Sequence, residues 1–488
     1  MLTAEVKTIR KMEEDAVISG IPEYELMLRA GVMAAEWIKK VFHSANRFVV
    51  LCGSGNNGGD ALVCAGILSA GYPVVVYSTA NKEKFSGCAA NAVRDLPEDI
   101  PFYVKDHLTT ADFRSGDVII DGLLGIGFAG EVLRERVSNF IAVVNSLHYP
   151  VISLDLPSGI NGDSGKAAVN GAVNADHTLT FGAPKPGLFL NDGAKLRGSL
   201  RVMDIGLNLL PEKEPMRVFT NTDAIGLLPD VAPDCHKNSR GRVAVWGSSP
   251  EYPGAAALCT LGALKSGAGI VRCASEADLS GRLCNAAIFQ KLSHGEIPEK
   301  FLSSSDVLVC GCGWGSCAGK AGIGAALEFP GTVVLDADAL NFVAGNPQVW
   351  KKRENIILTP HPGEGARLLA AFGVAASECR RENARNLAEK LHSVILWKGR
   401  DTVVASPSEE PVIIAAGTPL LATAGSGDVL AGVIGALASS GANAFDAACL
   451  GAYIHGIAGE IADRVIIADQ LPELISQVLF QLRRNAII

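Results

Sequence analysis

The sequence predicts an α/β protein with two domains, on three observations. The chain of 488 residues is too long for one core of ordinary size. Gly accounts for 53 residues and aromatic residues for only 6% of the chain, a composition typical of α/β layers joined by tight glycine turns. Short apolar runs alternate with segments at helical spacing in both halves, which indicates parallel sheets.

The first half begins with helices and continues as a sheet. Residues 3–40 predict two helices, because Gly20 can end one of them and Pro22 can begin the next. Apolar runs predict strands at residues 47–52, 74–78, 117–120, 151–154 and 178–181. A glycine-rich loop at 53–60 follows the first strand, and a helix is expected at 61–70.

A linker is expected near residues 207–222, where Pro211 and Pro215 accompany alternating charges. We therefore place the domains at residues 1–210 and 211–488. The second half predicts strands at residues 242–246, 306–310, 332–335, 355–358, 394–398 and 412–415. Helices are expected at 255–266 and along the apolar run after Asp428. The halves share this architecture but no motif, so they are not repeats.

Charge and apolar patterning exclude several classes of protein. A net charge of −8 argues against nucleic acid as the main partner. No uncharged apolar run reaches about 18 residues, so no membrane span is expected. Charged residues fill the place where a signal peptide would be apolar, namely Lys7, Arg10, Lys11, Glu13 and Glu14. We therefore expect a cytoplasmic protein.

The twelve cysteines form no paired framework. Cys310, Cys312 and Cys317 lie close together in the sequence. No C-x-x-C pair or nearby His completes a zinc set, so a metal site at this cluster is not expected.

Polar residues gather where the strands of the first half end. Asp60 lies in the glycine-rich loop, whereas Asp121 and Asp155 directly follow strands. Each aspartate alone is more typical of a helix or turn cap. Three glycine-flanked cases at one sheet edge favour a ligand site, because the carboxyl ends of parallel strands share that edge. We expect them to converge with Asn57 and Ser158, and such oxygen ligands suit a hard cation.

The second half carries the pattern of a phosphate site. The segment 422–438 places Gly425 and Gly427 at the start of a helix, where unpaired N–H groups and the helix dipole suit an anion. Asp428 is either a helix cap or a group that faces the phosphate as a base or metal ligand. His361 could equally be a hydrogen-bonded turn residue, and Lys398 could be a solvated charge of a loop. Their combination on one sheet edge nevertheless predicts a nucleotide-phosphate site.

These motifs, taken in order, resemble those of the bifunctional NAD(P)H-hydrate repair enzymes over nearly the whole chain. The first half resembles their epimerase domain at residues 55–60, 121–125 and 155–159. The second half resembles their ADP-dependent dehydratase domain at residues 252–255, 336–341, 359–364, 398–399 and 424–428. The chain departs from the family's usual Asn, Gly, Ala and Thr at Arg29, Ala61, Gly122 and Ile126.

The resemblance implies a fold and two reactions. It implies an N-terminal Rossmann-like three-layer α/β/α domain and a C-terminal ribokinase-like α/β domain. The first would interconvert (R)- and (S)-NAD(P)HX, the hydrates of NADH and NADPH. The second would phosphorylate the hydroxyl of the (S) form from ADP, releasing AMP and phosphate and restoring NAD(P)H. The implied cofactors are K⁺ in the epimerase domain and Mg²⁺ in the dehydratase domain, and a homo-oligomer is expected.

The resemblance also implies site residues. Substrate contacts in the first half are Asn56, Asn57, Gly58, Gly59, Asp60, Gly125, Ile126, Gly127, Phe128, Ala129, Gly130, Glu131 and Asp155. Potassium ligands are Asn57, Asp121 and Ser158. Substrate contacts in the second half are Ala255, Gly313, His361 and Asp428, and nucleotide contacts are Lys398, Gly399, Arg400, Asp401, Thr402 and Gly427. Asp155 and Asp428 are the expected catalytic residues.

Two other classes of function stay open at this point. A ribokinase-like small-molecule kinase with an appended nucleotide-binding domain fits the same anion loop, and it would release a stable phosphorylated product. A nucleotide sensor without catalysis would bind but not turn over. A sensor makes poor sense of Asp428, because a carboxylate beside a phosphate weakens the binding of an anion.

Overall fold

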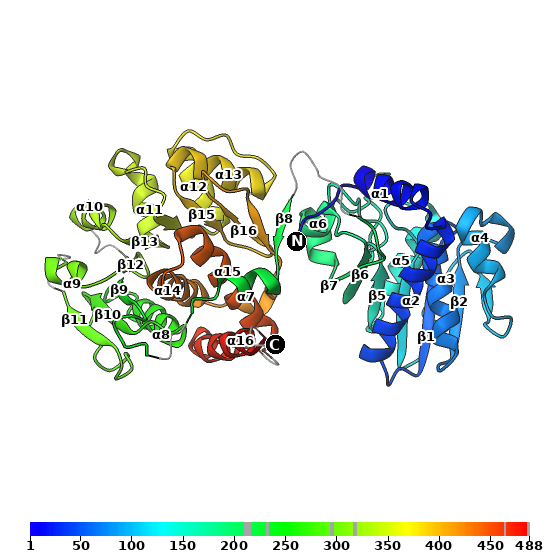
Figure 1. Ribbon diagram of the computed structural model, residues 1–488, viewed down its shortest axis with the longest axis horizontal. Helices are drawn as coiled ribbons and strands as arrows, with labels where there is room; N and C mark the ends of the chain where they lie inside the picture. The colour runs from blue at the N-terminus through cyan, green and yellow to red at the C-terminus, as the bar shows by residue number, and fades with distance from the viewer. Residues whose placement is uncertain (209–215, 231–233, 293–296, 316–319, 463–464, 486–488) are drawn as a thin grey trace. The chain divides into compact units, whose positions relative to one another are not determined.

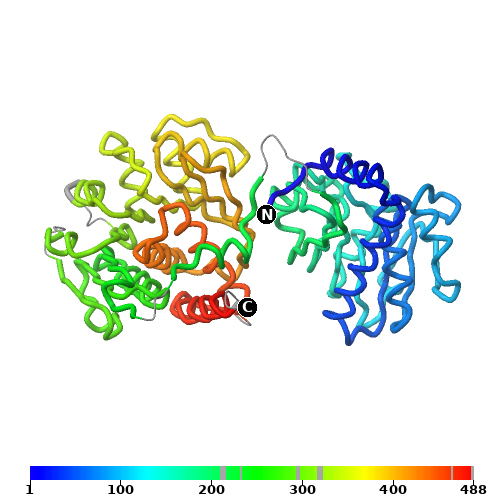
Figure 2. The backbone as a smooth tube through the Cα atoms, in the orientation of Figure 1, coloured from blue at the N-terminus to red at the C-terminus, as the bar shows by residue number. Residues whose placement is uncertain are grey.

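The computed structural model describes residues 1–208, 216–230, 234–292, 297–315, 320–462 and 465–485. The chain forms two compact units, Leu2–Met216 and Arg217–Ile488, and Met1 groups with the second. Figure 2 follows the first unit from blue to green and the second from green to red. The predicted boundary between residues 210 and 211 lies outside the described residues and stays a prediction.

The first unit is built on a sheet of seven parallel strands in the order β3-β2-β1-β4-β5-β6-β7. The strands are β1 (Arg47–Cys52), β2 (Val74–Ser78), β3 (Phe102–Val104), β4 (Asp117–Gly122), β5 (Val151–Leu154), β6 (His177–Phe181) and β7 (Ser199–Met203). The five predicted strands are confirmed within two residues. β3 and β7 were not predicted; they form the two edges and are partly exposed, so neither carries a buried apolar run.

Helices cover both faces of this sheet (Figure 1). They are α1 (Val6–Ile18), α2 (Glu23–Val41), α3 (Asn56–Ser69), α4 (Gly87–Arg94), α5 (Glu135–Ser146) and α6 (Asn191–Leu196). The break between α1 and α2 confirms the stop at Gly20. The start expected for α3 is wrong, because the helix begins at Asn56 and the presumed loop 56–60 is its first turn. A Cβ on Gly58 would lie 1.8 Å from the carbonyl oxygen of Gly53, so this glycine serves close packing.

The second unit is built on a ten-stranded sheet in the order β11-β10-β9-β12-β13-β14-β15-β16-β17-β8. The strands are β8 (Arg217–Phe219), β9 (Arg242–Trp246), β10 (Ile270–Ser275), β11 (Ile288–Lys291), β12 (Val307–Cys310), β13 (Thr332–Leu335), β14 (Ile356–Leu358), β15 (Val394–Trp397), β16 (Thr402–Ala405) and β17 (Val412–Ile414). All six predicted strands are confirmed. Within this sheet, β16 alone runs antiparallel to its neighbours.

Four strands of this sheet were not predicted. β8 lies inside the expected linker, which therefore ends earlier than residue 222. β10 mixes Arg and Ser with apolar residues, and β11 is largely exposed. The segment 398–402 was expected as a loop after a strand, but it is the turn of a hairpin that leads into β16.

A group of three packed helices lies at the centre of the second unit. α14 (Ser426–Ser439) is apolar on nearly every side and packs against α8 (Ala255–Lys265) and α15 (Ala444–Glu460) (Figure 1). The helix predicted after Asp428 is confirmed, although it begins at Ser426. The remaining helices are α7 (Asn221–Leu227), α9 (Glu299–Ser303), α10 (Lys320–Glu328), α11 (Asp338–Gly345), α12 (Pro362–Ala371), α13 (Arg380–Leu391) and α16 (Leu471–Asn485).

The strand orders locate the ligand crevices. In the first unit the chain reverses its direction of travel across the sheet between β1 and β4, and in the second between β9 and β12. Ligands of open α/β sheets bind at such switch points, beyond the carboxyl ends of the strands. Among the described helices, none is long and apolar enough to cross a membrane.

Candidate active sites

A cavity of about 1250 Å³ opens at the switch point of the first unit. Its walls come from the turn after β1, the segment that follows β4, and the first two helices. Of the predicted substrate contacts, the following line it: Asn56, Asn57, Asp60, Gly125, Ile126, Gly127, Phe128, Ala129, Gly130 and Asp155. Gly58, Gly59 and Glu131 are not part of this lining; Gly58 and Gly59 lie within the α3 packing.

Asp121 is buried behind the cavity and held by hydroxyl and backbone donors. Ser158 Oγ and Ser153 Oγ donate to its carboxylate at 2.6 and 2.7 Å, and the Ser158 N–H donates at 2.9 Å. Burial raises the pKa of Asp121, and these hydrogen bonds oppose the rise. Among the described residues, no Lys or Arg forms an ion pair with it. An ionised Asp121 is therefore a buried negative charge without a cationic partner.

Asn57 supplies the second part of a cation site. Its Nδ2 donates to the carbonyl oxygen of Leu124 at 2.9 Å, whereas its buried Oδ1 has no hydrogen-bond partner among the described residues. The Ser158 hydroxyl lies 3.1 Å from the same Leu124 oxygen. The amide oxygen without a hydrogen-bond partner lies near a hydroxyl, a carbonyl and a carboxylate that has no cationic partner among the described residues. Such a set of oxygens fits a hard cation such as K⁺. Asn57, Asp121 and Ser158 thus converge as predicted.

Asp155 projects into the cavity from the end of β5. Its φ of 65° lies in the left-handed region, which Asp adopts more readily than most residues. One carboxylate oxygen accepts from the Ile126 N–H at 3.1 Å and the other from Lys185 Nζ at 2.5 Å. Lys185 was missed in the sequence, although a lysine between two prolines just after β6 was an available signal.

Of the other carboxyl groups that line the same cavity, Asp60 and Glu13 have raised pKa values. Burial raises the pKa of Asp60 well above its usual value, and the charges of Asp155 and Glu13 add to this. Burial also raises the pKa of Glu13 to about 7, again with a contribution from Asp155. In the sequence, Glu13 was considered only as one of the charges that argue against a signal peptide. Its place in the cavity follows from the packing of α1.

The departures at Ala61 and Gly122 concern two residues that pack against each other. A Cβ on Gly122 would lie 2.3 Å from the Cβ of Ala61, a distance that atoms cannot adopt. A chain with Ala at residue 122 therefore needs Gly at residue 61, which is the pair of residues that the resemblance led us to expect. The chain described here exchanges the two and preserves the volume. Arg29 lines a separate hollow, where it pairs with Glu25 at 3.1 Å.

In the second unit, Asp336 and Lys398 form the charged base of the site at the ends of β13 and β15. Lys398 Nζ donates to Asp336 Oδ1 at 2.7 Å, and Thr359 Oγ1 donates to the same oxygen at 2.7 Å. Burial alone would lower the pKa of Lys398, but the carboxylates of Asp336 and Glu364 outweigh it and raise the pKa. The α-carbon of Gly427 faces Lys398 Nζ and Asp336 Oδ2. A phosphate at the start of α14 would thus lie beside an ammonium.

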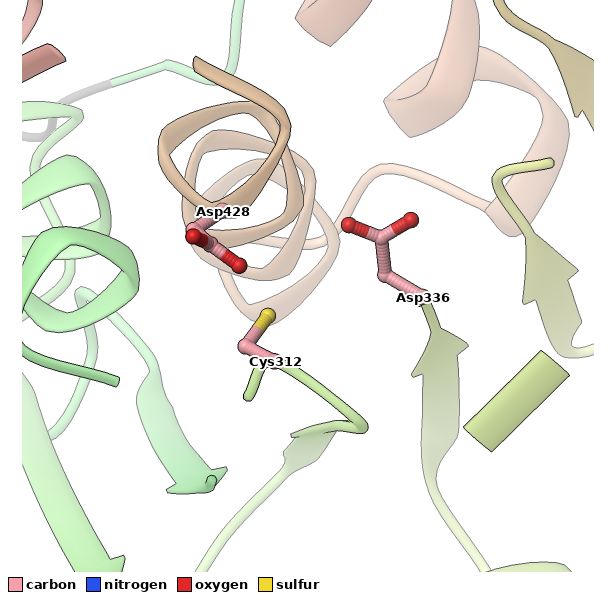
Figure 3. Close-up of side chains that lie close together, drawn as sticks. All are labelled: Cys312, Asp336 and Asp428. Atoms are coloured by element: carbon pink, nitrogen blue, oxygen red, sulfur yellow. The ribbon is translucent and has the colours of Figure 1, made fainter. Parts of the chain in front are cut away.

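Asp428 lies in the first turn of α14, close to Cys312 and Asp336 (Figure 3). One ligand atom from each of these three residues lies within 4.8 Å of the other two. Burial raises the pKa of Asp428 to about 6, and the negative charge of Asp336 adds to this, whereas a hydrogen bond from Cys312 opposes it. A carboxylate that titrates near neutrality in a polar cleft suits a general base.

The three cysteines at which no metal site was expected have different surroundings in the structure. Cys310 is buried, and Cys317 lies outside the described residues. Cys312 is the cysteine that faces Asp428. A hydrogen bond with Cys259 is the larger cause that raises the pKa of the Cys312 thiol, and burial is the second. The oxygens of Asp336 and Asp428 suit Mg²⁺, whereas a thiol does not.

The start of α14 is fixed by Gly425, which was expected there, and by a histidine that the sequence did not reveal. Gly425 has a φ of 89°, which a residue with a side chain rarely adopts. His455 Nε2 lies 3.1 Å from both the hydroxyl and the carbonyl oxygen of Ser426. Burial lowers the pKa of His455 to about 4, so the ring is neutral at pH 7. A single His inside the apolar α15 gave no signal for this role.

The other predicted contacts of the second half also gather at this edge. Gly313 packs so closely on Ala255 that a Cβ would lie 2.7 Å from the Ala255 Cβ. His361 caps α12, where its Nδ1 accepts from the Gly363 N–H at 3.0 Å. The imidazole is half exposed and remains accessible to a ligand.

The predicted nucleotide segment forms the turn between β15 and β16. The Thr402 hydroxyl donates to the carbonyl oxygen of Gly399 at 3.0 Å, and Asp401 has a φ of 51°. Arg380 donates to the carbonyl oxygens of Arg400 and Asp401. These bonds hold the turn that follows Lys398.

Comparison with known proteins connects both sites to one family. A family model described as NAD(P)H-hydrate dehydratase matches residues 243–480, and one described as YjeF-related protein N-terminus matches residues 23–187. The bifunctional NAD(P)H-hydrate repair enzyme Nnr of Coxiella burnetii is 37% identical over 479 residues, covering 93% of this chain and 94% of that protein. The enzyme of the same name from Escherichia coli is 34% identical and covers 93% of this chain and 88% of its own.

Solved structures are also similar to part of the chain. The ADP/ATP-dependent NAD(P)H-hydrate dehydratase from Bacillus subtilis, co-crystallised with ATP and Mg²⁺, is 25% identical with a TM-score of 0.45. That match covers 55% of this chain and 99% of the other.

Proposed function

The chain belongs to the bifunctional NAD(P)H-hydrate repair enzymes, and we propose which of its residues carry out the two reactions. Its first domain is the Rossmann-like epimerase and its second the ribokinase-like dehydratase of hydrated nicotinamide cofactors. The observation that carries the proposal for the second domain is the Asp428 carboxylate beside the glycine turn of α14, close to Lys398.

In the second domain ADP donates a phosphoryl group to the hydroxyl of (S)-NAD(P)HX. Asp428 takes the hydroxyl proton, the freed oxygen bonds to the terminal phosphorus of ADP, and AMP leaves. The N–H groups at Gly425–Gly427 hold the transferring group. The ring C–O bond then breaks, phosphate leaves and the nicotinamide regains its double bond. Phosphorylation is needed because hydroxide is a poor leaving group.

The remaining residues bind the two substrates. Ala255, Gly313 and His361 contact the hydrate, and the turn Lys398–Thr402 with Gly427 holds the nucleotide. Mg²⁺ would be held by the nucleotide phosphates and Asp336, and when bound it neutralises phosphate charge. This assignment is supported by Asp336 Oδ2 facing the first turn of α14.

In the first domain Asp155 is the acid–base group of epimerisation. Its position in the cavity, on the edge where the strands end, supports this role. K⁺ would be held by Asn57, Asp121 and Ser158, and it supplies a fixed positive charge beside the cavity. The lining residues from Gly125 to Gly130 contact the substrate. We infer further a cytoplasmic homo-oligomer, which sedimentation of the purified protein can check.

One assay tests the proposal against its rivals. Purified protein is incubated with NADHX and ADP while the absorbance of reduced nicotinamide and free phosphate are both followed. Repair yields NADH and phosphate in equal amounts. A stable phosphorylated product would instead indicate a small-molecule kinase, and binding without turnover would indicate a sensor.

A further inference from the structure

Lys185 is a buried ammonium that the proposed function does not use. Its side chain is 1% exposed and reaches the wall of the first-domain cavity. Nζ donates to Asp155 Oδ1 at 2.5 Å, to Thr180 Oγ1 at 3.1 Å and to the carbonyl oxygen of Phe181 at 3.0 Å. An ammonium has three donors, so all of them are engaged within the protein. Lys185 can therefore act on a substrate only through Asp155.

The contacts of Lys185 hold Asp155 in one orientation. The two carboxylate oxygens of Asp155 are fixed separately, one by the ammonium and one by the Ile126 N–H. The left-handed backbone at Asp155 turns the side chain into the cavity. A charge-assisted hydrogen bond of 2.5 Å favours the ionised carboxylate, which is the form that accepts a proton.

The cavity contains more carboxyl groups than the ammonium can neutralise. Asp60 on α3 and Glu13 on α1 line it together with Asp155. Lys185 forms its ion pair with Asp155, and neither of the other two carboxyls is paired with it. Burial raises the pKa of Asp60, so this group has a proton to donate, whereas Asp155 accepts the hydrogen bond of the ammonium. One wall thus offers a proton acceptor and another a proton donor.

We propose that Lys185 is the positioning residue of epimerisation, which holds Asp155 as the proton acceptor, and that Asp60 is the proton donor. This inference rests on the proposed function of the first domain. It assigns separate groups to the two proton transfers that the reaction requires.

The step is a reversible opening of the hydrated ring. Asp155 takes the proton of the hydroxyl on the carbon beside the ring nitrogen, and the O–H electron pair becomes the C=O bond. The bond between that carbon and the nitrogen breaks, its electron pair goes to the nitrogen, and Asp60 supplies the proton there. Rotation of the aldehyde and reversal of both transfers close the ring on the other face. No atom is gained or lost, so the product is the other epimer.

Two variants of the full-length chain test the two roles. Epimer exchange is followed by NMR without nucleotide, so that the second domain is silent, and ADP is then added to measure dehydration as an internal check. Asp60→Asn keeps the shape but loses the proton, and its kcat for exchange should fall about 10²–10⁴-fold. Lys185→Gln should lower kcat about 10²-fold, because Asp155 is no longer fixed. KM should change little in Lys185→Gln, since Lys185 has no donor left for the substrate.

The pH profile separates a positioning role from a merely structural one. Besides Asp155 and Lys185, the carboxyl and guanidinium groups that line the cavity are those of Arg10, Glu13, Glu14, Glu23, Asp60 and Arg134. Without the ammonium beside it, the Asp155 carboxylate should accept a proton from solvent more readily. As the pH is lowered, the rate of Lys185→Gln should therefore begin to fall at a higher pH than the rate of the wild type. The matched control is Lys195→Gln, which removes an exposed lysine paired with Asp192 at 3.3 Å in the same domain. Its exchange rate and profile should equal those of the wild type.

The outcomes distinguish this inference from the proposal beneath it. A wild-type protein that leaves the epimers unexchanged refutes the proposed function of the first domain. If the wild type exchanges them, a wild-type kcat and pH profile in Lys185→Gln overturn the role of Lys185, and a wild-type kcat in Asp60→Asn overturns that of Asp60. If Lys185→Gln does not fold, as far-ultraviolet circular dichroism would show, Asp60→Asn still decides the assignment of two proton-transfer groups.

Discussion

Asp428 acts as a base only when it is ionised, and its surroundings set the pH at which this happens. Burial and the charge of Asp336 raise its pKa to about 6. A base with a raised pKa is protonated below that value, so kcat/KM for dehydration should fall as the pH drops through about 6. Asp336→Asn removes one negative charge and frees Lys398, and both changes should move this limb to lower pH. Initial rates measured from pH 5 to 8 check the shift.

Removal of the Asp428 carboxylate should separate catalysis from nucleotide binding. Asp428→Asn should lower the dehydration rate about 10²–10⁴-fold, because the base is lost. The affinity for ADP should stay equal or become tighter, since a negative charge beside the phosphates is removed. Isothermal titration and phosphate release measure the two effects. Near-normal turnover would return Asp428 to the role of a first-turn residue that favours the helix dipole.

Asp121 and Asp155 lie on the same edge but should fail in different ways. Asp121→Ala should weaken hydrate binding and abolish the response of epimerisation to added K⁺, because the proposed cation loses its carboxylate. Asp155→Asn should lose rate while binding is largely kept. Epimer exchange by NMR in potassium and in sodium salts distinguishes them.

The control for this experiment lies on the same strand. Asp117 is also a buried aspartate of β4, but it lies at the other end and pairs with Arg47 at 2.6 Å. Asp117→Asn should lower stability without altering the response to K⁺. A potassium response that survives in Asp121→Ala would show that the cation is held elsewhere.

At the scale of elements, the contact between α3 and β4 has room for one methyl group. Ala61 on α3 supplies it here, opposite Gly122 on β4. Gly122→Ala should destabilise the first domain by about 1–3 kcal/mol, because its Cβ would overlap that of Ala61. The added change Ala61→Gly should recover most of this loss. Equilibrium denaturation of the two single variants and the double variant gives the coupling free energy. If the two effects simply add, the exchange of these residues is not a compensation.

At the scale of the whole molecule, the two reactions should divide with the two units. A fragment of residues 1–208 should epimerise the hydrates without nucleotide. A fragment of residues 216–488 keeps β8, which pairs with β17, and it should consume only the (S) form and only with ADP or ATP. The fragments are assayed with each epimer in turn. Equal activity of the second fragment without nucleotide would contradict phosphorylation.

Much of this organisation could be read from the sequence, because local patterns determine it. Buried parallel strands are continuous apolar runs, so β1 and β13 could be placed to the residue. Glycine-flanked aspartates after such strands indicated the ligand edge of the first half, and the glycines before the apolar helix indicated that of the second; the candidate sites lie at these edges. The order of the motifs also resembled one family, to which the chain belongs.

Other features depended on contacts between distant segments, which only the tertiary structure could decide. Lys185 pairs with Asp155 across 30 residues and His455 meets Ser426 across 29, so no local pattern marks either pair. Glu13 reaches the cavity because of the way α1 packs. Cys312 faces Asp428 because β12 ends beside α14. Buried strands and the turns that follow them depend on local chemistry, whereas the charge around a carboxylate is determined by its neighbours in space.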